Sequence, residues 1–146
     1  MFSQTAEYAL RAVVWLASAG GAPLATREIA RAAQVPPDYL SKVLQSLGRA
    51  GLVEAQRGKH GGFVLARPAA AVTVLEVVNA VDPLRRIRTC PLGLRGHGRR
   101  LCALHRRMDE ALAQMEAALG STTIAALVAE PSPVRPLCAR REAVHA

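Results

Sequence analysis

The residues with the clearest chemical potential are cysteines, because two of the three in the chain flank one unusual segment. Cys90 and Cys102 stand on either side of a stretch rich in arginine, glycine and proline, and Cys138 lies near the C-terminus. No signal-peptide pattern opens the chain, so we expect a cytoplasmic protein whose cysteines serve metal or redox chemistry rather than a disulfide framework. The electropositive segment also favours the thiolate, which is both metal ligand and nucleophile. Cys138 has no motif around it and is expected to be a free thiol.

A second set of residues has the reach to contact bases and phosphates, and it gathers on one face of an expected helix over 37–50. Apolar residues at i, i+3, i+4 and i+7, beginning at Leu40, must face inward. Pro37 suits the first helical position, and Gly51 ends the helix. The opposite face carries short and long polar groups, namely Asp38, Tyr39, Ser41, Lys42, Gln45 and Arg49.

A shorter helix precedes this face and a hairpin follows it. Thr26 is expected to cap the shorter helix, and 52–56 and 63–67 are expected to be strands joined by a glycine-rich tip over 57–62. A helix–turn–helix with a basic hairpin is a winged-helix pattern, in which the second helix enters the major groove and the wing reaches the backbone or minor groove. The expected DNA contacts are Thr26, Arg27, Pro37, Asp38, Tyr39, Ser41, Lys42, Arg49, Arg57, Lys59, His60 and Gly61.

Composition agrees with a single small domain that binds a polyanion. The chain has 146 residues and a net charge of +8, and 51% of its residues are hydrophobic but only 3% aromatic. Alanine, leucine and valine must therefore build the core. A basic balance suits nucleic acid or an anionic membrane surface, but no uninterrupted apolar segment is long enough to cross a bilayer.

The remaining pattern predicts a mainly α fold with a small β-hairpin wing and a long dimerisation helix. A helix is expected over 3–18, and a capping box at Thr73 opens a short helix that runs to Val81. From Leu101 to Gly120 apolar residues keep a three-four spacing, which suggests pairing with a second subunit. The expected units are a winged domain over 1–82, a sensor loop over 83–100, a dimerisation helix and last helix over 101–130, and a disordered tail over 131–146.

Four segments together give the chain a family resemblance. They are AEYALRAVVWLA near the start, VPPDYLSKVLQSLGRAGLV in the second helix, the wing RGKHGGFVLARP, and TVLEVVNAVD before the cysteine segment. The chain resembles the Rrf-two family of bacterial winged-helix regulators from about residue 3 to residue 120. The resemblance implies a homodimer that binds an inverted-repeat operator, usually as a repressor. Many members sense redox state, nitric oxide or iron supply through an iron–sulfur cluster in the loop before the long helix.

The resemblance also implies a ligand set, although the pattern here departs from the common one. Cluster-bearing members commonly place three cysteines in the loop with five residues between neighbours. The middle place here falls on Gly96, which has no ligand atom, while the first and third are cysteines. The implied ligands are Cys90, Cys102, His105 or His97, and Glu7, the last matching a position that in some relatives ligates from the partner subunit. Mixed ligation suits a two-iron two-sulfur cluster better than a four-iron one.

Several alternatives stay open from the sequence. The cysteines could form a thiol or disulfide switch without metal, bind zinc, or have no sensing role. Glu7 also suits the first turn of a helix as a favourable charge. An enzyme is not expected, because the chain has no C-x-x-C motif, phosphate-binding loop or nucleophile with a His/carboxylate set. A winged-helix protein adaptor is disfavoured by the polar face of the second helix.

Overall fold

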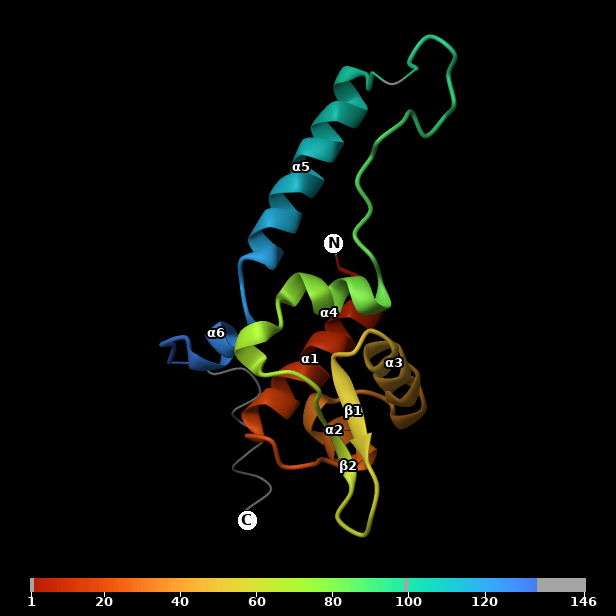
Figure 1. The fold of residues 1–146 in the computed structure, drawn as a ribbon. Helices are drawn as coiled ribbons and strands as arrows, with labels where there is room; N and C mark the ends of the chain where they lie inside the picture. Colours follow the sequence, from red (N-terminus) through yellow and green to blue (C-terminus); the bar gives the residue numbers. More distant parts are fainter. Residues whose placement is uncertain (1, 99, 134–146) are drawn as a thin grey trace.

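The computed structural model describes residues 2–98 and 100–133, which form a mainly helical fold with one two-stranded antiparallel sheet. The elements are α1 (Gln4–Ser18), α2 (Thr26–Ala33), α3 (Pro37–Arg49), β1 (Val53–Gln56), β2 (Gly62–Leu65), the 3-10 turn η1 (Ala69–Ala71), α4 (Val74–Val81), α5 (Ala103–Gly120) and α6 (Ile124–Ala129). Elements α1 to α4 pack with the hairpin into one body, while α5 extends away from it and carries a long loop at its far end (Figure 1). The predicted fold class is confirmed.

The core is built from small and branched apolar side chains around α1. Helix α1 contacts α2, α3, α4, α6 and β2, so it is the central element of the body. Its alanines Ala9 and Ala12 are fully buried, which lets neighbouring helices approach closely. The predicted inward stripe of α3 is confirmed, because Leu40, Val43, Leu44 and Leu47 are all buried.

The helix–turn–helix begins differently from the prediction. The expectation that Thr26 caps α2 is wrong, since Thr26 is the first residue of the helix and Ala25 occupies the cap position. Alanine has no side-chain acceptor, and the Glu28 carboxylate instead accepts the Ala25 backbone N–H at 3.1 Å. At the other end Gln34 turns left-handed with φ +55°, and Pro37 then opens α3 as predicted.

Backbone geometry at the wing requires glycine at two positions. The strands pair in register from Val53↔Leu65 to Gln56↔Gly62, and Leu24 adds a short bridge through two backbone bonds with Phe63. A Cβ at Gly61 would lie 2.2 Å from the Gln56 carbonyl oxygen, and one at Gly62 would lie 2.4 Å from Leu24. Any side chain at these positions would push the tip of the wing out of place.

The base of the wing is fixed to α4 by a charged contact. The predicted capping box is confirmed, because the Thr73 hydroxyl accepts the Glu76 N–H and the Glu76 carboxylate accepts the Thr73 N–H. Arg67, just after β2, donates to both Glu76 oxygens at 2.9 and 3.2 Å and also to the Ala71 carbonyl. The contact with Arg67 is the main cause that lowers the pKa of Glu76. The direction of the wing is therefore tied to α4.

The long helix starts later than predicted. Helix α5 begins at Ala103 with Cys102 as its cap residue, and α6 begins at Ile124 with Thr123 capping the Ala126 N–H. Within the described residues no helix is long and apolar enough to cross a membrane. Cys138 and the tail beyond residue 133 lie outside the described residues.

Candidate functional site

The exposed face of α3 splits into side chains that are free to reach outward and side chains that are already engaged. Asp38, Lys42 and Arg49 are exposed, as predicted for groups that contact DNA. The Ser41 hydroxyl donates to the Pro37 carbonyl one turn back at 3.2 Å. Tyr39 is also engaged, because its hydroxyl forms a hydrogen bond with Thr5 of α1. Fewer side chains on this face are therefore free than its sequence suggests.

A small polar and aromatic network ties α1 to the helix–turn–helix. The Tyr8 and Tyr39 rings meet edge to face with centroids 5.4 Å apart, and the Arg11 guanidinium lies 5.5 Å from the Tyr8 ring centre. Arg11 also donates to the Ala33 carbonyl at the end of α2 and to Glu7, at 3.2 and 3.1 Å. Tyr39 is thus a positioning residue for α3. Sequence reasoning missed Arg11, because its contact with Ala33 spans 22 residues.

The remaining predicted DNA contacts lie around the turn and the wing. Arg27 and Pro37 line a small hollow at the turn between α2 and α3, and Thr26 is half-buried beside them. Arg57, Lys59 and His60 are exposed at the wing tip, while Gly61 is half-buried against the backbone of the same turn. The wing tip projects from the body at the end opposite the long loop (Figure 1).

The cysteine loop brings some, but not all, of the implied metal ligands together. The Cys102 Sγ lies 3.5 Å from the His105 Nδ1, one turn into α5. The His97 Nδ1 is shielded from solvent and has no hydrogen-bond partner among the described residues. Glu7 lies on α1 and pairs with Arg11. No group of three His, Cys, Asp or Glu side chains converges on one point within residues 2–98 and 100–133.

The Cys90 thiol is activated, but by a cause other than the predicted one. The backbone N–H groups of Leu94, Leu92 and Gly93 lower the pKa of the Cys90 thiol, with Leu94 the largest contributor, and partial burial opposes them. The expectation that the arginines of the segment would favour the thiolate is corrected on this point. A tight turn after Cys90 aims amides at the sulfur, whereas Arg88, Arg95 and Arg100 are exposed to solvent.

A clamp that the sequence did not reveal joins the start of the loop to α5. The Arg86 guanidinium donates twice to the Asp109 carboxylate, at 2.7 Å for each bond, and the Ile87 backbone N–H donates to it at 2.9 Å. Both side chains are mostly shielded, at 23% and 16% exposed. Bonding to Arg86 first, and then to Ile87, lowers the pKa of Asp109 to about 2. The clamp fixes the loop four residues before Cys90 and fixes α5 four residues after His105.

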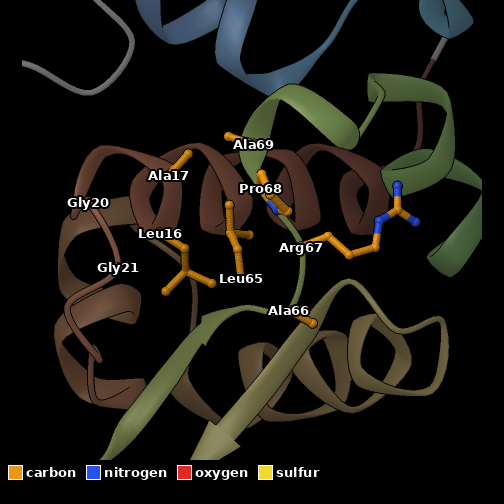
Figure 2. A pocket seen from close by; sticks show the side chains of 9 residues that line it. All are labelled: Leu16, Ala17, Gly20, Gly21, Leu65, Ala66, Arg67, Pro68 and Ala69. Carbon is orange, nitrogen blue, oxygen red and sulfur yellow. The ribbon is translucent and has the colours of Figure 1, made fainter.

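A hollow beside α1 offers little chemistry. It measures about 410 Å³ and lies between the end of α1 and the segment that follows β2. Its walls are mostly apolar side chains and glycine backbone, and the Arg67 guanidinium points away from it (Figure 2). Arg67 is instead directed to Glu76.

The chain matches one protein family along nearly all of its described length. The model of the Rrf2 family, described as an iron-dependent transcriptional regulator, matches residues 2–130. A Mycobacterium tuberculosis protein assigned as an HTH-type transcriptional regulator is 36% identical over 125 residues, which cover 84% of this chain and 78% of that protein. Both matches agree with the expectation of a transcriptional regulator.

Solved structures of similar fold include regulators of the same kind. CymR, the global cysteine regulator of B. subtilis, has a TM-score of 0.73 at 23% identity, with 90% of this chain and 98% of CymR covered. IscR of T. potens has a TM-score of 0.73 at 21% identity, with 92% and 93% covered. At these identities the likeness establishes the winged-helix fold. Family match, sequence relative and fold agree, and this chain belongs to the Rrf2 family of DNA-binding transcriptional regulators.

Proposed function

We propose that the protein is a homodimeric repressor whose affinity for an inverted-repeat operator depends on the state of the loop that carries Cys90 and Cys102. The observation that carries the proposal is the position of that loop. It joins the DNA-binding body to α5, and the Arg86–Asp109 clamp ties it to α5. A change at the cysteines would therefore act on the helix that we assign to dimer formation.

The state of α5 supports pairing with a second subunit. The helix has 18 residues and none of them is buried, and Leu104 and Met108 are 64% and 48% exposed. Exposed apolar side chains at three-four spacing suit a symmetric contact with the same helix of a partner. Such a dimer would place two α3 helices at a fixed separation, which must match grooves about 34 Å apart.

The split of the α3 face assigns roles to the predicted DNA contacts. Asp38 and Lys42 are free to reach base edges, whereas Tyr39 holds α3 against α1. Lys59 and its neighbours at the wing tip suit phosphates, which give affinity without sequence information. If Lys42 pairs with guanine, Lys42→Ala should cost about 1–3 kcal/mol of discrimination between operator and random duplex. Lys59→Ala should weaken both duplexes almost equally.

Gel shifts with the two variants, across a salt series, test the DNA assignment. Removing one phosphate contact should flatten the plot of log affinity against log salt by about one unit. An operator sequence is obtained by selecting duplexes from a random library with the wild-type protein. Equal loss of operator and random binding in the Lys42 variant would refute base reading by Lys42. Absence of any salt-dependent duplex binding would refute the proposed function itself.

An iron–sulfur cluster, best suited as two-iron two-sulfur, is the proposed sensor group. The donors fit in type, because two thiols and two imidazoles lie in or beside one loop, and the His97 Nδ1 lacks a partner among the described residues. The full set would be Cys90, Cys102, His105 or His97, and Glu7 of the partner subunit. When bound, the cluster would supply reversible electron transfer and reactivity toward oxidants. Glu7 of the partner subunit could ligate the cluster only if the loop closed onto that subunit.

The visible absorption of protein purified without oxygen tests the cluster. We expect a coloured protein with iron and sulfide in equal amounts, and alanine at Cys90 or Cys102 should abolish both colour and iron. A colourless protein without iron or sulfide would refute the cluster. Zinc found in its place would assign the cysteines to a structural metal site.

A metal-free thiol switch is the second candidate, and the environment of Cys90 favours it. Both described cysteines are free, and backbone amides lower the pKa of the Cys90 thiol. A thiolate reacts with oxidants far faster than a thiol does. If the protein is colourless, oxidation of Cys90 and Cys102 should change operator affinity, and prior alkylation should block that change. Unchanged affinity after both treatments would remove this candidate.

A further inference from the structure

The net positive charge of the chain does not lie on its winged domain. Residues 83–108 contain eight arginines and no acidic residue, whereas residues 1–82 contain eight basic and six acidic residues. Residues 109–146 contain three basic and five acidic residues. The formal charge of +8 for the whole chain is thus equal to the charge of this one segment. A polyanion attracted by net charge would meet the segment before the α3 face.

Five of these arginines form an exposed surface, here named the arginine tip. Its members are Arg85, Arg88, Arg95, Arg100 and Arg106, all exposed and without an ion pair among the described residues. Arg86 and Arg107 are excluded, because they pair with Asp109 and Glu110. The start of α5 adds to the positive potential, since its first turn has no acidic residue and its cap lacks a side-chain bond.

The arginine tip extends away from the wing, toward the opposite end of the molecule. The segment that carries the tip rises from the end of α4 alongside α5 to a loop beyond its far end, and the wing projects from the other side of the body (Figure 1). Electrostatic screening in physiological salt acts over about 8 Å, so two such remote surfaces attract anions independently. In the cluster-free protein, a duplex bound to α3 and the wing therefore leaves the arginine tip open to a second contact.

The chemistry of the tip suits phosphate. All of the segment's basic residues are arginines, with no lysine among them. The guanidinium is always charged, weakly hydrated and planar, and its paired donors match two phosphate oxygens. Duplex DNA presents one such charge about every 1.7 Å along its axis. For a DNA-binding regulator, DNA is also the polyanion that is always nearby.

We infer that the arginine tip is a second DNA-contacting surface, which binds the phosphate backbone of duplex DNA without sequence preference and separately from α3 and the wing. Through it a protein seated on its operator would also hold flanking DNA or a second duplex. The inference goes beyond operator reading and concerns the protein without a cluster, because a cluster ligated by Glu7 of the partner subunit would close the loop onto that subunit.

Salt dependence on a random-sequence duplex tests the inference with matched variants. Arg85→Gln with Arg88→Gln removes two charges from the tip, and Arg57→Gln with Lys59→Gln removes two from the wing. Removing one arginine–phosphate pair should reduce the salt slope by about 0.9, so the tip double variant should reduce it by nearly two units. The ratio of operator to random affinity should stay unchanged in the tip double variant. The wing double variant shows that the assay detects the removal of two phosphate-binding charges.

Replacement of all five tip arginines by glutamine extends the test. Its expected effect is a drop of about four to five units in the random-duplex slope. Should that variant fold poorly by circular dichroism, the exposed pair of Arg85 and Arg88 still decides the question. An unchanged slope in the double variant would overturn the inference. Because operator discrimination is read separately, failure of the tip and failure of the winged domain are distinguishable.

Other partners of the tip would give different results. Leu92 is 73% exposed within the same loop and would not help to bind phosphate. Leu92→Ser should leave duplex binding unchanged. The inference would be overturned if poly-glutamate or anionic phospholipid vesicles bound more tightly than duplex and if Leu92→Ser lost that tighter binding. Such a result would indicate a protein or membrane partner. A tip variant that sediments as a monomer would overturn it in favour of a contact between subunits.

Discussion

Replacing Leu104 and Met108 together by alanine is expected to separate the proposed dimer. Full burial of a leucine or methionine side chain contributes about 1.5–3 kcal/mol. Leu104 is 64% exposed and Met108 48% exposed. Covering that surface in a partner's α5 would therefore contribute about 2–3 kcal/mol per subunit, and a symmetric contact counts it twice. The double variant should weaken the dimer by about 4–6 kcal/mol, which is roughly three to four powers of ten in Kd.

Sedimentation equilibrium over a wide range of protein concentration measures this change. Two matched substitutions that introduce a charge give the control, because Ala111 and Ala117 are both exposed alanines of α5. At about 100° per residue, Ala111 lies within the apolar seam and Ala117 faces away from it. Ala111→Glu should dissociate the dimer, while Ala117→Glu should not. Equal sedimentation of wild type, the double variant and Ala111→Glu would refute the assignment of α5 as the dimer contact.

Two further predictions concern the clamp and the wing. Asp109→Asn should speed alkylation of Cys90 and hydrogen exchange in the loop, while Glu110→Gln, at the neighbouring position on α5, should change neither rate. Equal rates in wild type and both variants would contradict the clamp. The pKa of Asp109 falls from 3.8 to about 2 on folding, so the stability contributed by the clamp is complete above pH 3.8 and is lost as pH falls through about 2. In acid unfolding of Asp109→Asn, this pH-dependent loss of the clamp's stability should be absent. Gly61→Ala would place a Cβ 2.2 Å from a backbone oxygen and should lower operator affinity. As a control, Gly48→Ala would place its Cβ an ordinary 3.8 Å from the Val53 oxygen and should stabilise α3 by about 0.5–1 kcal/mol. Normal DNA binding by Gly61→Ala would contradict the steric argument.

Features that depend on near neighbours in the chain were predictable from the sequence. The inward stripe of α3, beginning at Leu40, needs only the helical period, and it is buried as predicted. The capping box at Thr73 and the start of α3 at Pro37 follow equally from local stereochemistry. The resemblance that identified the family also rests on continuous segments, and the family match confirms it. Such signals lie within a few residues, where the conformation of the chain leaves few choices.

Features that depend on the path of the chain through space were not predictable. Arg86 and Asp109 are 23 residues apart, and Tyr39 and Thr5 are 34 apart. Nothing in either segment alone indicates that these groups meet. The amides that activate Cys90 depend likewise on the fold of its loop, which is why the sequence predicts the direction of its pKa shift correctly but from the wrong cause.

The charge of the chain shows the same division. Sequence alone determined its sign and its arginine-only source between residues 83 and 108, because composition needs no coordinates. Only the tertiary structure decided that this segment runs alongside α5 to a loop beyond its far end, away from the wing. The physical reason is that α5, with 18 residues and a length of about 27 Å, extends from the body, and this carries the far loop beyond the range over which salt lets its charges interact with the wing.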